Sequence, residues 1–191
     1  MSNPEPSRPR LFTGIALNRE ARQLVSEIQE LLRESVEGVR WVDPHNFHVT
    51  LKFLGWCDPG LVPEILSVLS EAARLLPLRL EIGGAGGFPS DRAARVVWVG
   101  AEETTGNLEK MFKMIDRGVR RLGFERESRR YTPHVTIGRA RKPVRLDLGG
   151  LPAVGQSVSL DVGDIILYRS ELKKGGAVYS VLERVAGGQG R

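Results

Sequence analysis

The chain has 191 residues, of which 41% are hydrophobic and 27% are charged, a composition typical of one compact domain or of two small lobes that share a core. No apolar run approaches the ~18 residues of a membrane-spanning helix, the polar N-terminus lacks the apolar stretch of a signal peptide, and a lone Cys57 excludes an internal disulfide. The net charge is +5, with 22 arginines against 6 lysines, and arginine binds phosphate through a planar fork of donors. A phosphate-bearing or nucleic-acid partner is therefore one expectation, although a solvated arginine-rich surface also accounts for the charge. We expect a cytoplasmic monomer with no membrane association.

The apolar spacing alternates between strand and helix patterns along the chain. In chain order it predicts a strand at 11–17, a helix at 19–35, a strand at 47–54, a helix at 58–76, strands at 78–82 and 95–99, a helix at 107–122, and strands at 134–139, 158–168 and 177–185. Asn18 and Asp58 are expected to cap the first two helices, and Gly123 to end the third. Residues 1–9 are interpreted as a flexible leader and residues 186–191 as a flexible tail, which leaves a single domain at 10–185.

A glycine-rich stretch at 83–87 lies between two predicted strands and is interpreted as a tight loop. It lacks the lysine of a phosphate-binding P-loop and does not match the glycine pattern of a dinucleotide site, which argues against a nucleoside triphosphate site. The mixture of short strands and long helices without strict alternation predicts an α+β fold.

One short motif occurs twice. His48-Val49-Thr50-Leu51 and His134-Val135-Thr136-Ile137 lie 86 residues apart and use two of the three histidines of the chain. A single histidine on a strand is more often a packed or surface residue than a functional one. The repetition of the whole tetrapeptide points instead to a shared function for the two histidines.

Strand geometry indicates which side chains of the two motifs can act together. Residues two apart on a strand share a face, so His48 projects with Thr50, and His134 projects with Thr136. If the two strands lie side by side about a pseudo-two-fold axis, two imidazoles and two hydroxyls meet in one site. A neutral imidazole accepts a proton and its conjugate acid donates one, while threonine hydroxyls can donate hydrogen bonds to phosphate oxygens. This set suits displacement at phosphorus without a metal or a cofactor.

Other chemistries fit less well. A zinc site needs a third ligand that the two histidines do not have in the sequence. Cys57 lies in an ordinary Trp-Cys-Asp-Pro context, and no serine occurs in a Gly-x-Ser-x-Gly turn, so a nucleophilic triad is not indicated.

The two motifs and their surroundings resemble the 2H phosphoesterases, specifically the RNA 2′,3′-cyclic phosphodiesterases, also called 2′-5′ RNA ligases. The segments that carry the resemblance are 46–55 (NFHVTLKFLG), 86–89 (GGFP), 95–100 (RVVWVG), 132–139 (TPHVTIGR), 167–172 (LYRSEL) and the late Tyr179. Together they span roughly residues 10–185.

The resemblance implies a bilobal, pseudo-two-fold fold with two antiparallel-sheet lobes, helices outside and a central cleft. It implies hydrolysis of RNA that ends in a 2′,3′-cyclic phosphate, or of small cyclic nucleotides, to a 2′-phosphomonoester. By analogy, His48 would donate a proton to the departing 3′ oxygen and His134 would accept one from water. The near-symmetry of the motifs leaves these two roles interchangeable on chemical grounds alone.

Three neighbours of the motifs have their own expectations. Arg139 resembles an arginine of the family and is expected to bind the phosphate, although strict alternation places it opposite His134 unless a bulge at Gly138 redirects it. Phe53 is one position out of phase with His48 and is predicted to be in the core. His45 is expected at the surface.

Aromatic and basic residues near the motifs have two interpretations. Trp41, Trp56 and Phe88 could stack on a terminal base, but apolar packing is the preferred expectation for each. Arg129 and Arg130 are candidates for contacts with an RNA backbone or are simply part of a solvated loop.

Three functions remain compatible with the sequence: hydrolysis of the cyclic phosphate, the reverse joining of RNA halves through a 2′-5′ bond, and a nucleotide- or RNA-binding module without turnover. Intact histidine and threonine in both motifs favour an enzyme over a pure binder, because binding alone needs no general acid or base.

Overall fold

The structure is a computed structural model that describes residues 8–173 and 176–188. Most of the predicted leader (1–7) and the end of the predicted tail (189–191) lie outside the described residues. The strands are β1 (Arg10–Ala16), β2 (Val39–Trp41), β3 (His48–Trp56), β4 (Leu78–Phe88), β5 (Ala94–Glu102), β6 (His134–Val144), β7 (Ser157–Val162), β8 (Asp164–Lys173) and β9 (Gly176–Ala186). The α-helices of the described part are α1 (Arg19–Ser35), α2 (Val62–Ala72) and α3 (Asn107–Arg120).

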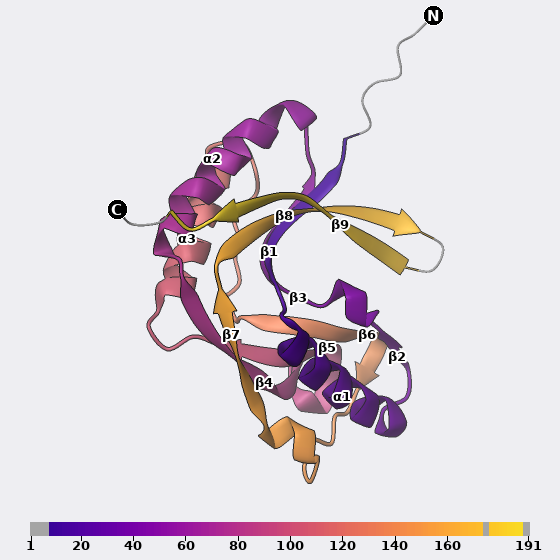
Figure 1. The fold of residues 1–191 in the computed structure, drawn as a ribbon. Coiled ribbons are helices and arrows are strands. Elements are labelled where there is room, and N and C mark those ends of the chain that lie inside the picture. The colour runs from indigo at the N-terminus through magenta and orange to yellow at the C-terminus, as the bar shows by residue number, and fades with distance from the viewer. Residues whose placement is uncertain (1–7, 174–175, 189–191) are drawn as a thin grey trace, which may run out of the picture.

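All strands belong to one curved antiparallel sheet, in the order β7-β4-β5-β6-β3-β1-β8-β9, with β2 also paired to β6 (Figure 1). We call β3, β1, β8 and β9 the His48 half, and β6, β5, β4 and β7 the His134 half. The halves join where β3 meets β6, and the pair Val49–Val135 is in register there. The two strands that carry the repeated motif are therefore neighbours at the centre of the sheet.

The helices begin and end close to where the sequence predicts. The side chain of Asn18 accepts a hydrogen bond from the backbone N–H of Ala21 at 2.8 Å and caps α1. The second predicted helix is α2 flanked by short 3-10 turns at Pro59–Leu61 and Ala73–Leu75. Gly123 follows α3 with a φ of +92°, a conformation that glycine adopts without strain.

Each half of the chain contributes a strand–helix–strand unit, β1-α1-β3 and then β5-α3-β6. Helix α1 packs against β4, β6 and β7 of the His134 half, whereas α3 packs against β3 of the His48 half and against α2. Figure 1 shows α2 and α3 together on one side of the molecule and α1 on another. Each of α1 and α3 thus supports the motif strand of the opposite unit.

Two further strands, β4 and β8, also pair with strands of the opposite unit. β4 follows the first motif strand in sequence, yet it pairs with β5 and β7. β8 follows the second motif strand and pairs with β1 and β9. The fold is α+β and duplicated, as predicted, and its two halves are interlocked.

Two predictions about the elements were wrong. The segment 158–168 is not one strand, because the chain passes at Gly163 from β7, at the edge of the His134 half, to β8 in the His48 half. The glycine-rich stretch is not a loop but part of β4. Its glycines permit close packing: a Cβ at Gly86 would lie 2.4 Å from the indole of Trp98, and one at Gly83 would lie 2.4 Å from a backbone oxygen of Gln156.

The sheet has two packed faces. The main core lies under the helices and includes Val49 and Val135, both fully buried. A smaller cluster of Phe12, Ile166 and Tyr168 lies apart from it, with Tyr179 packed alongside. None of the helices in the described ranges is long and apolar enough to span a membrane.

Candidate active site

The β3–β6 junction brings the two motifs together. Val49 and Val135 face each other and point into the main core, so the flanking residues of each motif point to the opposite face of the sheet. Continued by one residue in each direction, this antiparallel register sets His48 across from Thr136 and Thr50 across from His134. We call the sheet face that carries these four side chains the motif face.

Both imidazoles are held in the same way. Nδ1 of His48 is 2.7 Å from the backbone oxygen of Asn46, and Nδ1 of His134 is 2.7 Å from that of Thr132. A carbonyl can only accept, so each Nδ1 carries the proton and each neutral ring presents an unprotonated Nε2. Nε2 of His48 lies 3.0 Å from the hydroxyl of Thr50, which donates to it. The Nε2 atom of each ring is therefore the one available for proton transfer on the motif face.

Burial keeps both histidines neutral. It lowers the pKa of His48 to about 4, against the hydrogen bond to Asn46, which raises it. The charge of His134, when that ring is protonated, and the charges of Arg139 and Arg22 add to the lowering. Burial also lowers the pKa of His134, again helped by the charge of Arg139. The charge of Arg139 therefore acts on both rings.

Aromatic rings surround each imidazole. The ring of His48 is 4.7 Å from Phe12, 5.3 Å from Tyr179 and 5.7 Å from Tyr168, measured between centroids. The ring of His134 is 5.1 Å from Phe88 and 6.3 Å from Trp98. These rings supply much of the burial that lowers the two pKa values.

A β-bulge follows the threonine in each motif. In β6, Thr136 pairs with Trp98 and Gly138 pairs with Val97, so Ile137 is an extra residue and alternation shifts by one. The shift turns Arg139 to the motif face, as predicted for a bulge at Gly138.

The same shift in β3 overturns the prediction for Phe53. Thr50 pairs with Gly14 and Lys52 with Thr13, which leaves Leu51 as the extra residue. Phe53 therefore turns to the motif face instead of the core; its side chain is 56% exposed and its ring lies 5.8 Å from Phe12. Phe53 and Arg139 are equivalent positions, each the fifth residue after its histidine.

Buried polar side chains support both bulges. Gln29 of α1 is fully buried and donates from Nε2 to the backbone oxygens of Ile137 at 2.9 Å and Val42 at 2.7 Å. Beside the other bulge, Lys52 lies 2.8 Å from Asp116 of α3 and donates to the backbone oxygen of Glu125 at 2.8 Å. Each bulge is thus tied to a helix of the opposite unit.

Sequence reasoning missed these supporting residues. Gln29 and Asp116 are polar residues on amphipathic helices whose apolar stripes are buried. Their position on these helices was the one feature of the sequence that could have pointed to them. Asn46 was also missed: its side chain donates to the backbone oxygen of Ala177 at 2.8 Å, while its own backbone oxygen holds His48. Asn46 thereby connects β9 to the first motif.

The remaining candidates lie elsewhere or in other roles. His45 is exposed beside Asp43, as expected, and Trp41 packs against the main core. Phe88 lies against His134 and so belongs to the site. Trp56 was expected to pack but is 68% exposed at the far end of β3.

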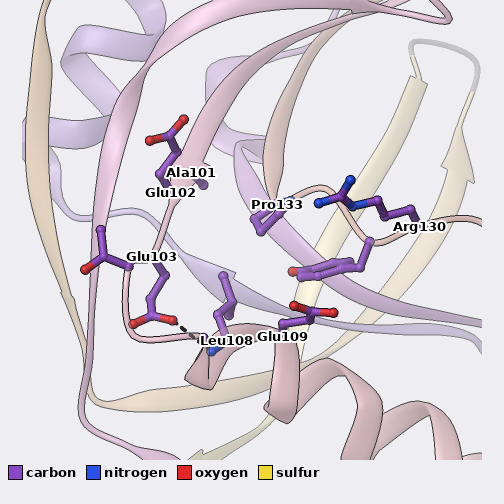
Figure 2. A pocket seen from close by; sticks show the side chains of 10 residues that line it. Ala101, Glu102, Glu103, Leu108, Glu109, Arg130 and Pro133 are labelled. Carbon is purple, nitrogen blue, oxygen red and sulfur yellow. Dashed lines mark hydrogen bonds between the residues drawn. The ribbon is translucent and has the colours of Figure 1, made fainter.

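Arg129 and Arg130 are exposed, and Arg130 lines a hollow of about 280 Å³ that contains neither motif histidine. Figure 2 shows Glu102, Glu103 and Glu109 around this hollow with Arg130 at its side. Glu103 accepts from the backbone N–H of Leu108 at 3.2 Å, at the start of α3. The carboxylates make this hollow a poor place for a phosphate, and we assign it no function.

In the described ranges, no three His, Cys, Asp or Glu side chains gather as a metal-binding group. The absence of a cofactor stays a prediction. The groups that the motif face offers for chemistry are two imidazoles, two hydroxyls and a guanidinium.

The fold and site define the class: an α+β protein with a duplicated strand–helix–strand unit and a His-x-Thr motif on each of two adjacent central strands. A family model described as LigT-like phosphoesterase matches this chain twice, at residues 15–98 and 99–179. The chain therefore belongs to the LigT-like phosphoesterase family, and the two matches correspond to its duplication.

Similar proteins agree with this assignment. An RNA 2′,3′-cyclic phosphodiesterase of Methanothermobacter thermautotrophicus is 37% identical over 181 residues, which cover 91% of this chain and 96% of that protein. A crystal structure from Thermus thermophilus matches with a TM-score of 0.77 and 30% identity, over 93% of this chain and 97% of its own. The E. coli LigT complexed with 3′-AMP matches with a TM-score of 0.73 and 28% identity, over 95% and 99%.

Proposed function

We propose that this chain hydrolyses the 2′,3′-cyclic phosphate at the end of an RNA, or of a small cyclic nucleotide, to a 2′-phosphomonoester. The observation that carries the proposal is the antiparallel pairing of Val49 with Val135 where β3 meets β6. Continued by one residue in each direction, this register sets each motif histidine across from the threonine of the other motif. Relatives named RNA 2′,3′-cyclic phosphodiesterase, similar over most of the chain, support the substrate class. The protein is proposed to act as a monomer in the cytoplasm.

The reaction needs one proton acceptor and one proton donor on opposite sides of phosphorus. Nε2 of His134 takes a proton from water, whose oxygen forms the new bond to phosphorus. The bond from phosphorus to the 3′ oxygen breaks, and protonated His48 gives its Nε2 proton to that oxygen. One proton is taken and one is given, so the total charge on the two histidines is unchanged, and proton exchange with solvent then returns His134 to its neutral form and His48 to its protonated form.

The remaining side chains stabilise the charge on the phosphate. The hydroxyls of Thr50 and Thr136 donate hydrogen bonds to its non-bridging oxygens, and the Arg139 guanidinium offsets the charge that builds up as water attacks. Asn46 and Thr132 act through the histidines, because their backbone oxygens fix which nitrogen carries the proton.

His48 must take up a proton from solvent when the substrate binds. In the free protein the pKa of His48 is lowered to about 4, so the ring is neutral at pH 7. A phosphodiester carries one negative charge, and an anion beside an imidazole raises its pKa. Substrate binding therefore favours the protonated, donating form of one histidine.

The test is hydrolysis of a short oligoribonucleotide with a 2′,3′-cyclic end, in the presence of EDTA, with the product identified as a 2′- or a 3′-phosphate. We expect a 2′-phosphate, no loss of rate with EDTA, and a kcat lower by roughly 10² to 10⁴ in His48→Ala and in His134→Ala. The double variant should lose little more than the worse single variant, because the two groups act in one step.

His45→Ala is the matched control, since His45 is exposed and its ring pairs with Asp43 outside both motifs. Activity near that of wild type in either motif variant would refute the two-histidine mechanism. Loss of activity with EDTA that one divalent ion restores would refute the metal-free reaction.

A further inference from the structure

The motif face continues beyond His48 along β1 and β3. In register, Phe12 pairs with Phe53, and Arg10 pairs with Trp56. Directly opposed residues share a face, and so do Arg10 and Phe12, which are two apart on a strand that pairs regularly with β8. Because the ring of Phe12 contacts His48, Trp56 and Arg10 lie on the same face as the histidines.

A second bulge brings Trp56 to this face. Leu54 is an extra residue between Phe53 and Gly55, and Gly55 has a φ of +74°, as in bulges that place a glycine in the left-handed region. The side chain of Trp56 is 68% exposed. Together with Phe53, it leaves two large aromatic side chains exposed on the same face as the histidines.

Its position sets the size of that ligand. His48 pairs with Ala16 and Trp56 pairs with Arg10, so the two are separated by the length of β1, about 20 Å of strand. A mononucleotide with its cyclic phosphate at the histidines does not extend so far. An RNA chain of several nucleotides does, and the exposed ring of Phe53 lies along the way.

The chemistry fits single-stranded RNA better than a protein partner. Proteins that bind single strands combine stacked aromatic rings with cations for the backbone phosphates, and stacking is worth about 1–3 kcal/mol per base. Arg10 is the direct cross-strand neighbour of Trp56, and the chain carries a net charge of +5. Continuity with the histidines places such a strand with its end at the reacting phosphate.

We propose that Trp56, with Arg10 beside it, is a remote subsite that stacks a base upstream of the cyclic phosphate and makes this chain select oligoribonucleotides over cyclic mononucleotides. The proposal rests on the proposed function for the position of the RNA end. Trp56 takes no part in the reaction itself.

The experiment compares kcat and KM for adenosine 2′,3′-cyclic phosphate with those for di-, tetra- and hexaadenylates that end in a cyclic phosphate. In wild type we expect kcat/KM to rise once the RNA is long enough to reach the indole. Trp56→Ala should remove this rise, about 5- to 100-fold for the hexamer and through KM, and leave the mononucleotide unchanged. Trp56→Phe should keep most of the rise in kcat/KM with RNA length. Arg10→Gln should lower the slope of log KM against log salt by about 1.

Val178→Ala is the control, because Val178 is also an exposed apolar side chain but alternates with Tyr179 and so points away from the motif face. A wild-type rate independent of length, or an equal effect of Trp56→Ala on all lengths, would overturn the subsite.

A binding measurement separates this inference from the proposed function. Fluorescence anisotropy of a labelled hexaadenylate with a 2′-phosphate end should show weaker binding to Trp56→Ala, whether or not the protein turns over. Length-dependent, Trp56-dependent binding without any hydrolysis would uphold the subsite and refute the proposed function. Hydrolysis with no effect of Trp56→Ala on binding or on KM would uphold the proposed function and refute the subsite.

Discussion

His48 and His134 have the same local chemistry but different pKa values. Each donates from Nδ1 to the carbonyl of the residue two positions earlier, so each presents the same nitrogen to a substrate. Burial lowers the pKa of His48 by a large amount, to about 4, and that of His134 by less. At pH 7 both rings are therefore neutral in the free protein.

The lowered pKa values of the two histidines give an expected pH dependence. The reaction requires one protonated and one neutral imidazole, so kcat/KM, which reports the free protein, should fall as pH rises through the higher of the two pKa values. Both values lie below the ordinary 6.5, which puts this alkaline limb on the acid side of 6.5. The limb of kcat should lie at higher pH, because the bound phosphate raises both pKa values. Rate profiles between about pH 4 and 9 measure both.

Replacing Arg139 tests whether a nearby positive charge lowers the pKa values of the two histidines. Its positive charge lowers both pKa values, so Arg139→Gln should raise them and move the alkaline limb of kcat/KM to higher pH. Arg141→Gln is the control, since the Arg141 charge is not among the causes that shift either ring. A limb that stays in place in Arg139→Gln would contradict the position we assign to the guanidinium.

At the scale of elements, the bulges decide which side chains reach the site. One extra residue in β6 turns Arg139 toward the histidines, and one in β3 turns Phe53 the same way. A helix from the opposite unit supports each bulge, through Gln29 in one case and Asp116 in the other. The helices thus determine the register of the site as well as covering the sheet.

Replacing Gln29 by Met tests this role. The change keeps an unbranched side chain but leaves the carbonyls of Val42 and Ile137 without that donor, so the free energy of unfolding should fall by about 1–3 kcal/mol. The alkaline limb of kcat/KM should also move toward that of Arg139→Gln, because a relaxed bulge no longer holds the guanidinium near the rings. Denaturant titration and the pH profile measure the two effects.

Gln23→Met is the matched control, because Gln23 is on the same helix but exposed. Loss of stability without any shift of the limb would mean that Gln29 only stabilises the fold.

The sequence predicts the elements well where a local pattern determines them. The apolar stripe of α1, its Asn18 cap and both motif strands follow from spacing and residue type. The prediction for Phe53 was wrong because alternation by twos assumes an unbroken strand, and the bulge that breaks β3 lies beside contacts distant in sequence. The prediction of one strand over 158–168 was wrong because an apolar run does not show where the chain passes between sheet edges. Gln29 acts on Ile137, 108 residues away, and no local pattern records such a contact.

At the scale of the whole molecule, the halves of the sheet are built from both halves of the chain. β4 belongs to the first half of the chain and lies between β5 and β7, while β1 lies between β3 and β8. We therefore propose that residues 10–185 fold as one cooperative unit.

The expected result is that a fragment of residues 1–93 does not fold alone, because β4 has no partner strand and α1 has no sheet to cover. The cut falls at the end of the short turn Asp91–Ala93, where it breaks no strand. Circular dichroism should show no cooperative thermal transition for either fragment, and one transition when residues 1–93 and 94–191 are mixed. A cooperative transition in the first fragment alone would contradict the single unit.

The exchange of Phe53 for Arg139 at equivalent positions has a consequence for recognition. In a site with true two-fold symmetry, a phosphate could bind in two orientations of equal energy, and half of the binding events would be unproductive. With a cation on one side and an aromatic ring on the other, we expect the two orientations of the substrate to differ in energy and the nucleoside to lie toward the aromatic side. In the proposed function the duplication supplies the acid and the base, and the difference between Phe53 and Arg139 gives the site its polarity.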